Sequence, residues 1–262
     1  MNILDKIKQH KKQEVQERKE LYPVKLLERS IFFNTACVSL KEYVTAATRS
    51  GVIAEFKRKS PSKGDINKYA DVEKVSIGYM QAGASALSIL TDEEFFGAKP
   101  GDMQTARKLN YCPILRKDFI IDEYQIIESR SMGADAILLI AKILNKSQVK
   151  ALAGFAKNIG LEVFLETHSK EEILMLELEN IDLVGVNNRN LDNFEVNIET
   201  SVKLAELLPK ETVKVAESGI ESPEAVKTLR DNGFQGFLIG EYFMRHSNPA
   251  EKCKELVKRI LK

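Results

Sequence analysis

Lysine and glutamate side chains close several short apolar runs of this sequence, at points where buried strands would end. An apolar run at 52–54 leads to Glu55 and Lys57, and later runs lead to Lys117, Glu166 and Glu217. An ammonium group beside carboxylates can donate and accept protons, which is the work of general acid–base catalysis. Burying such charges costs several kcal/mol per ion unless they are paired. The pattern indicates an enzyme that moves protons; a structural network of ion pairs is the alternative.

The elements that must position these residues alternate regularly from Gly51 onward. Short apolar runs are separated by amphipathic stretches, which indicates strands that alternate with helices. We expect strands at 51–56, 84–90, 112–117, 134–140, 161–167, 183–187, 212–218 and 236–240. We expect helices at 72–82, 101–109, 123–132, 146–158, 170–178, 198–207, 223–231 and 250–261. Eight such pairs predict an α/β fold, a (β/α)8 TIM barrel. A doubly wound open sheet is the alternative, but no G-x-G-x-x-G turn follows a strand here.

The first 50 residues differ from the rest and predict an N-terminal helical extension to one barrel domain over 1–262. A mixed-charge helix is expected at 5–20, and its charge run predicts a solvated face. Its thin apolar stripe consists of Ile3, Leu4, Ile7 and Val15. Two shorter helices are expected at 22–30 and 39–48, the second capped by Ser39.

Composition limits the possible partners. The formal net charge is +1, so no global field attracts nucleic acid or a membrane. The three cysteines and three histidines are too scattered for a disulfide framework or a metal site, which favours a reducing cytoplasm. No apolar stretch is long enough to span a bilayer. We expect a cytoplasmic monomer or weak homo-oligomer without metal or cofactor.

Strand parity predicts which side chains share one end of the barrel. Residues two apart in a strand face the same side, so Glu55 and Lys57 point together, whereas Arg58 and Lys59 need not. The same parity and strand-end position apply to Lys117, Glu166, Asn187, Arg189 and Glu217. Because barrel enzymes carry their active sites at the carboxyl ends of the strands, we expect these groups at one mouth.

Glycines after the last two predicted strands indicate a phosphate site. Gly219 follows Ser218, and Gly240 opens a short helical turn. Barrels commonly bind phosphate at these two turns through backbone N–H groups. Lys57 and Arg189 are candidate countercharges, so we expect a small phosphorylated molecule as the ligand.

Six segments, in this order and spacing, resemble the indole-3-glycerol phosphate synthase family: IAEFKRKSPSKG, LRKDFIID, LEVFLETH, VGVNNRNL, VAESGI and FLIGEYFM. The resemblance covers essentially the whole chain. It implies closure and decarboxylation of 1-(2-carboxyphenylamino)-1-deoxyribulose 5-phosphate, giving indole-3-glycerol phosphate, carbon dioxide and water in tryptophan biosynthesis. It implies Lys117 as the main general acid and Glu166 as the second acid–base group. Lys57 resembles a lysine that contacts the substrate and can transfer a proton, with Glu55 holding the lysines; Asn187, Glu217 and Ser218 resemble substrate-positioning groups.

The resemblance also implies the binding surfaces. An apolar wall for the aromatic ring is expected from Phe96, Phe119, Leu138, Leu191 and Leu238, with Ser60 and Pro61 in a loop above it. Arg189, Gly219, Gly240 and Glu241 are expected near the phosphate. Glu241 departs from the small residue common there, and a carboxylate aimed at phosphate would repel it. We therefore expect the Glu241 side chain to turn outward.

Two other functions compete with this one. The isomerase of the preceding pathway step is usually argued from a cysteine and an aspartate at strand ends, but the first strand here ends in Glu55 and Lys57. A non-catalytic barrel that binds sugar phosphates or a partner protein would be expected if the lysines and glutamates were lost, yet all are present. The synthase chemistry is therefore favoured.

Overall fold

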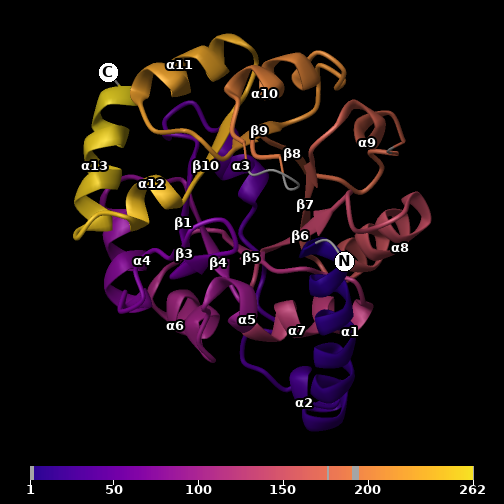
Figure 1. The fold of residues 1–262 in the computed structure, drawn as a ribbon. Helices are drawn as coiled ribbons and strands as arrows, with labels where there is room; N and C mark the ends of the chain where they lie inside the picture. Colours follow the sequence, from indigo (N-terminus) through magenta and orange to yellow (C-terminus); the bar gives the residue numbers. More distant parts are fainter. Residues whose placement is uncertain (1–2, 176, 191–194, 262) are drawn as a thin grey trace.

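Eight short apolar runs form parallel strands that close into one barrel, seen along its axis in Figure 1. The structure is a computed structural model that describes residues 3–175, 177–190 and 195–261. The barrel strands are β1 (Val52–Phe56), β4 (Ala86–Leu90), β5 (Ile114–Lys117), β6 (Ala136–Ile140), β7 (Glu162–Thr167), β8 (Leu183–Asn187), β9 (Lys214–Glu217) and β10 (Gly236–Ile239). Each pairs with its neighbour along the chain, and β1 pairs with β10 to close the ring. The predicted (β/α)8 barrel is confirmed, and the open sheet is wrong.

Helices surround this barrel. They are α4 (Val72–Gln81), α6 (Asp102–Leu109), α7 (Glu123–Met132), α8 (Lys146–Asn158), α9 (Lys170–Met175), α10 (Ile198–Ala205), α11 (Pro223–Asp231) and α13 (Pro249–Ile260), with short α5 (Glu93–Phe96) and α12 (Glu241–Met244). Polar side chains cap several starts; Asp122, for example, accepts a hydrogen bond from the Tyr124 N–H. The predicted bounds of α7, α8 and α11 are confirmed to the residue, whereas α10 ends two residues earlier than expected.

Barrel strands are buried on both faces because one face fills the interior and the other lies under helices. Every residue of β1, β4, β6 and β10 is buried. Two polar features interrupt this apolar layer at its carboxyl end: the ionisable side chains that close the strands, and a small hairpin of β2 (Lys59–Ser60) and β3 (Gly64–Asp65) within the β1–α4 connection. The polar side chains of the barrel strands are therefore concentrated at the mouth formed by the carboxyl ends of the strands.

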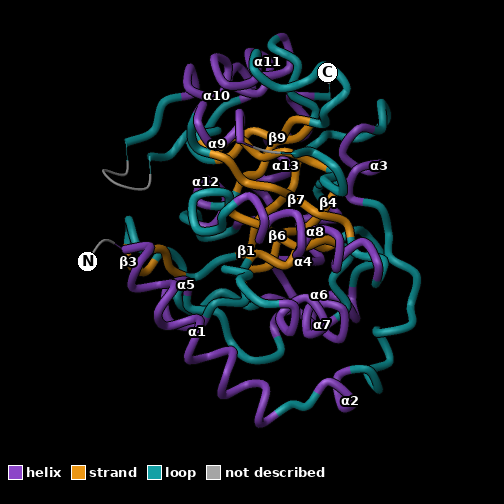
Figure 2. The backbone as a smooth tube through the Cα atoms, turned by 90° about the vertical axis from the view of Figure 1, so that its right-hand side faces the viewer, coloured by secondary structure: helices purple, strands orange, loops and turns teal. Residues whose placement is uncertain are grey.

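The described part of the N-terminal extension, from residue 3 onward, contains three helices, as predicted: α1 (Ile3–Leu21), α2 (Val24–Leu27) and α3 (Leu40–Thr45). Ser39 caps α3 by accepting a hydrogen bond from the Glu42 N–H at 3.0 Å. Helices α1 and α2 pack against α7. Figure 2 shows α1, α5, β3 and α12 together at one end of the barrel. The extension thus reaches the end where the strands terminate.

The charge run of α1 corrects one expectation. Most of its charged side chains are exposed as predicted, but Lys11 is completely buried. Leu4, Ile7 and Val15 of the apolar stripe are buried beside it. Lys11 therefore belongs to the buried face of α1, although its charge alone predicted a solvated position.

Candidate active site

The carboxyl ends of the strands surround one cavity, and almost every predicted site residue lines it. The polar and charged members are Glu55, Lys57, Ser60, Lys117, Glu166, Asn187, Arg189, Glu217, Ser218 and Glu241. The remaining members are Pro61, Phe96, Phe119, Leu138, Gly219, Leu238 and Gly240. Leu191 lies outside the described residues. Strand parity thus predicted which side chains converge at the mouth.

Lys117 lies between two buried carboxylates at the centre of this cavity. Its Nζ is 3.2 Å from Glu166 Oε2 and also contacts Glu217 Oε2. Burial by itself would lower the pKa of Lys117, but Glu217, Glu166 and Glu55 raise it above its ordinary value. The lysine is therefore an ammonium group at neutral pH, held in that state by the surrounding carboxylates.

The two carboxylates around Lys117 have different proton affinities. Burial would raise the pKa of Glu166, yet Lys117 together with His168 and Asn187 holds it well below its usual range. Burial and the neighbouring Glu166 raise the pKa of Glu217 to about 7, against the opposing effect of Lys117. Pairs of titratable groups with separated pKa values are typical of acid–base sites. The cavity therefore holds an ionised carboxylate, an ammonium and a carboxyl group that titrates near neutral pH.

The end of β1 divides its charges between two sides of the strand. Lys57 Nζ lies 2.8 Å from Glu55 Oε1 inside the cavity. Arg58 points the other way, where its guanidinium contacts both oxygens of buried Asp102 at 2.5 and 3.0 Å. Lys59 donates to the Glu94 carbonyl at 2.9 Å. The predicted separation of Glu55 and Lys57 from their charged neighbours is confirmed.

Residues at the end of β8 hold the neighbouring carboxylates in place. Asn187 Nδ2 donates to Glu166 Oε1 at 2.9 Å. Asn188, which parity turns away from the cavity, donates to the Ser218 carbonyl at 3.0 Å. Gly185 leaves room that a side chain would fill, because an added Cβ would clash with Glu217 Oε1 and the Phe164 ring. The roles of Gly185 and Asn188 were not predicted, since they depend on contacts between strands.

An apolar wall covers one side of the cavity. The Phe96 and Phe119 rings lie with centroids 5.9 Å apart. Leu138 and Leu238 line the same cavity from β6 and β10. Three residues of α1, which sequence reasoning assigned only to a helical stripe, complete the lining: Ile3, Leu4 and Ile7. Their apolar character at helical spacing predicted that these residues are buried. It could not predict which surface of the molecule they pack against.

The turns that follow β9 and β10 also line the cavity. Ser218 and Gly219 both adopt positive φ, 68° and 71°, and such backbone in a non-glycine residue is uncommon. At position 240 an added Cβ would lie 2.5 Å from Glu55 Oε1, so glycine is required there. The backbone that follows β10 therefore comes close to the Glu55 carboxylate.

Glu241 contradicts its expected orientation. Its side chain lines the cavity instead of turning outward, and its Oε2 accepts a hydrogen bond from Arg189 Nη2 at 3.0 Å. Lys63 Nζ lies 3.9 Å from its other oxygen. The physical reason is charge pairing: Arg189 is only 17% exposed, and a carboxylate satisfies its guanidinium.

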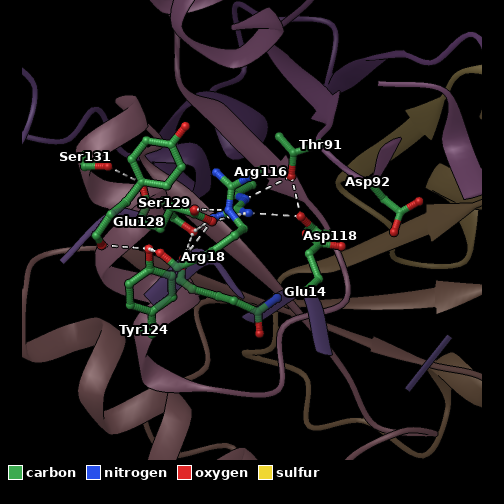
Figure 3. A network of polar contacts seen from close by, with 12 residues as sticks. Glu14, Arg18, Thr91, Asp92, Arg116, Asp118, Tyr124, Glu128, Ser129 and Ser131 are labelled. Atoms are coloured by element: carbon green, nitrogen blue, oxygen red, sulfur yellow. Dashed lines mark hydrogen bonds and ion pairs between the residues drawn. The ribbon is translucent and has the colours of Figure 1, made fainter. Parts of the chain in front are cut away.

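A buried ion cluster joins α1 to the strand ends beside Lys117. Lys11 Nζ lies 2.8 Å from Asp118 Oδ1 and 2.9 Å from Asp92 Oδ2. Burial would raise the pKa of Asp118, but Lys11 and Arg116 hold it well below its usual range. Figure 3 shows the adjoining network, in which Arg116 contacts Asp118 at 3.0 Å and Glu128 at 2.8 Å. The residue after Lys117 is therefore anchored by the N-terminal extension.

Two classes of feature are missing from the described part of the chain. No cluster of three or more histidine, cysteine, aspartate or glutamate side chains is arranged to hold a metal ion there. Among the same residues, no helix has the length and apolar character needed to cross a membrane.

Comparison with known proteins identifies the family. Residues 4–256 match the family model described as indole-3-glycerol phosphate synthase. The chain belongs to the indole-3-glycerol phosphate synthase family. Members of this family are carboxy-lyases of tryptophan biosynthesis, so the chain is an enzyme of the lyase class. This match decides against the isomerase and the non-catalytic barrel.

Relatives of this family match over nearly their whole length. Indole-3-glycerol phosphate synthase of Bacteroides thetaiotaomicron is 48% identical over 259 residues, covering 99% of both chains. The synthase of Caldanaerobacter subterraneus subsp. tengcongensis is 40% identical, covering 98% of both. That of Campylobacter jejuni subsp. jejuni is 38% identical, covering 97% of this chain and 100% of the relative.

Solved structures support the fold alone. A 3-hexulose-6-phosphate synthase from Salmonella typhimurium matches with a TM-score of 0.63 at 12% identity, covering 80% of this chain and 98% of that one. A mutant tryptophan synthase α-subunit from Pyrococcus furiosus matches with a TM-score of 0.59 at 12% identity, covering 82% and 98%. Both are too distant in sequence to transfer an activity to a synthase of this family.

Proposed function

We propose that the cavity binds 1-(2-carboxyphenylamino)-1-deoxyribulose 5-phosphate and converts it to indole-3-glycerol phosphate, carbon dioxide and water. One observation carries the proposal: an ammonium group, Lys117, lies between two buried carboxylates whose proton affinities differ, beside an apolar wall. Ring closure needs a proton at the ketone oxygen while the aromatic carbon attacks. Dehydration then needs one proton given to the leaving hydroxyl and one removed from the ring system. Lysine and glutamate supply both kinds of transfer.

Lys117 and Glu166 divide this work. Lys117 donates the proton to the carbonyl, because its raised pKa keeps it charged in the resting site. Carbon dioxide leaves from the ring carbon that has formed the new bond, and this restores the aromatic ring. Glu166 begins the cycle ionised and exchanges protons in the dehydration. Lys57, paired with Glu55 at 2.8 Å, contacts the substrate carboxylate or phosphate and is a second proton donor.

The remaining contacts orient the substrate. Asn187, Glu217 and Ser218 hydrogen-bond the ring-forming segment and the ribulose hydroxyls. The aromatic ring lies against Phe96 and Phe119, with the β2–β3 hairpin and Pro61 above it. The phosphate binds at the backbone of Gly219 and Gly240, with Arg189 and Lys57 as countercharges. A cytoplasmic location and a monomeric or weakly associated state stay predictions from the sequence.

Turnover of the substrate tests this function. Purified protein is mixed with the carboxyphenylamino-deoxyribulose phosphate, and the indole product is followed by its fluorescence. The chain has no tryptophan, so product emission is free of protein indole. Absence of an indole signal from folded protein would refute the proposal.

Variants test the assigned roles. Lys117→Met removes the proton donor, so kcat should fall by about 10²–10⁴-fold while substrate still binds. Glu166→Gln should also lower kcat. Lys59→Met is the matched control, because that lysine contacts the Glu94 carbonyl away from Glu55. Equal turnover by Lys117→Met and the wild type would contradict the role of Lys117.

A further inference from the structure

His168 lies directly behind the carboxylate of Glu166. The residue follows the last residue of β7, and its side chain is 6% exposed. Its Nε2 lies 3.0 Å from Glu166 Oε1, and its Nδ1 lies 3.6 Å from Glu172 Oε2 in the first turn of α9. The His168 backbone N–H also donates to Glu172 Oε2 at 2.7 Å. The imidazole is therefore held between two carboxylates, one of which faces the cavity.

This arrangement selects the protonated ring. A neutral imidazole has one N–H and one lone pair, so one of its nitrogens would present a lone pair to a carboxylate. An imidazolium presents an N–H on both sides. Burial would lower the pKa of His168, but the Glu166 and Glu172 carboxylates raise it to about 9. The contacts are ion-pair contacts, since neither ring nitrogen has a well-aligned hydrogen-bond partner among the described residues.

Other charged groups face the same region from neighbouring elements. Lys142 after β6 and Arg189 and Glu195 after β8 line a polar recess together with His168 and Glu172. Asn187 Nδ2 reaches the Glu166 oxygen that His168 contacts, at 2.9 Å. Among the described side chains, the cations at ion-pair distance from Glu166 are Lys117 and His168.

We propose that His168 is a positioning residue whose imidazolium, anchored by Glu172, fixes the Glu166 carboxylate in place and keeps it ionised after Lys117 has given up its proton. The inference rests on the proposed function, which assigns proton transfer to Glu166. Lys117 becomes neutral when it protonates the substrate carbonyl, and Glu166 then loses one of its two cations. His168 does not touch the cavity, so its charge is unchanged at that step. Glu166 can therefore still act as a base in the dehydration.

Substitution by glutamine separates charge from shape. His168→Gln places a neutral amide donor near the position of Nε2 and removes the cation. We expect kcat to fall about tenfold with KM within about twofold, since substrate binding does not involve His168. Loss of a cation raises the pKa of a nearby carboxylate, so the acidic limb of the kcat–pH profile should move up by about one pH unit. His10→Gln, the same change at a 42% exposed imidazole on α1, should leave kcat and the profile unchanged.

The outcomes separate the two proposals. Turnover by the wild type tests the synthase function by itself, whatever His168 does. An unmoved acidic limb in folded, active His168→Gln would overturn the positioning role, as would an equal loss at every pH. A fall in thermal stability without a shifted limb would assign His168 to structure alone.

A measurement on the unmodified protein keeps the inference testable if the variant does not fold. Two-bond ¹H–¹⁵N spectra of histidine-labelled protein report whether each ring nitrogen carries a proton. The chain has three histidines, so spectra of His10→Gln and His246→Gln identify His168 by elimination. We expect the imidazolium pattern up to pH 8 and deprotonation near 9. A neutral tautomer at pH 7 would overturn the proposal.

Discussion

At the scale of single residues, the candidate active site contains a row of alternating charges. Glu217, Lys117, Glu166, His168 and Glu172 follow one another, each carboxylate contacting at least one of the two cations. Three carboxylates share two cations, so one of them is least well compensated. Glu217 is the one whose pKa is raised to about 7, because burial and Glu166 outweigh Lys117. Glu217 can therefore change its charge near neutral pH when the negatively charged substrate that we propose enters the cavity.

Glu241 is the residue whose substitution should strengthen substrate binding. Its carboxylate occupies Arg189 and adds a negative charge where we propose that phosphate binds. Glu241→Gln should lower KM and tighten binding of inorganic phosphate by about fivefold, the equivalent of about 1 kcal/mol for a half-buried pair. Steady-state kinetics and phosphate titration measure this. Glu224→Gln, an exposed carboxylate that pairs with Arg259, is the control. Weaker phosphate binding would instead mean that Glu241 holds Arg189 in its binding position.

At the scale of elements, α1 is part of the wall of the candidate active site. Ile3, Leu4 and Ile7 line the cavity, and Lys11 one turn later joins α1 to the ends of β4 and β5 through Asp92 and Asp118. Asp118 is the neighbour of Lys117, and Asp92 caps α5, which carries Phe96. Docking of α1 therefore affects both the position of Lys117, the proposed general acid, and the aromatic wall.

Lys11→Met should undock α1. Removal of the ammonium takes the cation away from buried Asp92 and leaves Asp118 paired with Arg116 alone, and loss of one partner from a buried ion cluster typically costs about 3–5 kcal/mol. We expect a lower free energy of unfolding in urea and a higher KM, because the apolar wall loses its support. Lys12→Met is the matched control, since the adjacent lysine is exposed on the same helix. Unchanged stability and KM in Lys11→Met would show that the cluster does not hold α1.

The sequence predicted elements and faces better than it predicted partners. The spacing of apolar residues and the glycine or asparagine that ends a helix are both local features of the sequence. The bounds of α7, α8 and α11 could therefore be predicted from them. The alternation of side chains along a strand, also a local feature, correctly placed Glu55 and Lys57 on one side of β1 and Arg58 on the other. Lys11 and Glu241 were misplaced because a charge is buried only if distant residues compensate it. The sequence alone did not predict a role for His168, because the proposed role depends on its contact with Glu172 in the first turn of α9.

At the scale of the whole molecule, the two ends of the barrel have different tasks. The carboxyl ends of the strands hold the ion cluster of the active site, whereas the amino ends hold ion pairs that join strands. Asp135, just before β6, accepts hydrogen bonds from the Ile114 and Val38 N–H groups at 2.7 and 2.8 Å and from Arg107 at 2.6 Å. Asp182, just before β8, likewise binds the Val163 N–H and Lys157. Such residues stabilise the barrel without facing the cavity.

Asp135→Asn should therefore reduce stability and spare catalysis. The amide keeps the shape of the carboxylate but has one acceptor oxygen and no charge for Arg107, which is 11% exposed. We expect a loss of about 2–3 kcal/mol in urea unfolding, with kcat and KM within about twofold at temperatures where the variant is folded. Asp231→Asn, at the exposed end of α11, should change neither quantity. Because β6 separates Asp135 from the mouth by about 15 Å of strand, a fall in kcat at unchanged stability would contradict this division between the ends of the barrel.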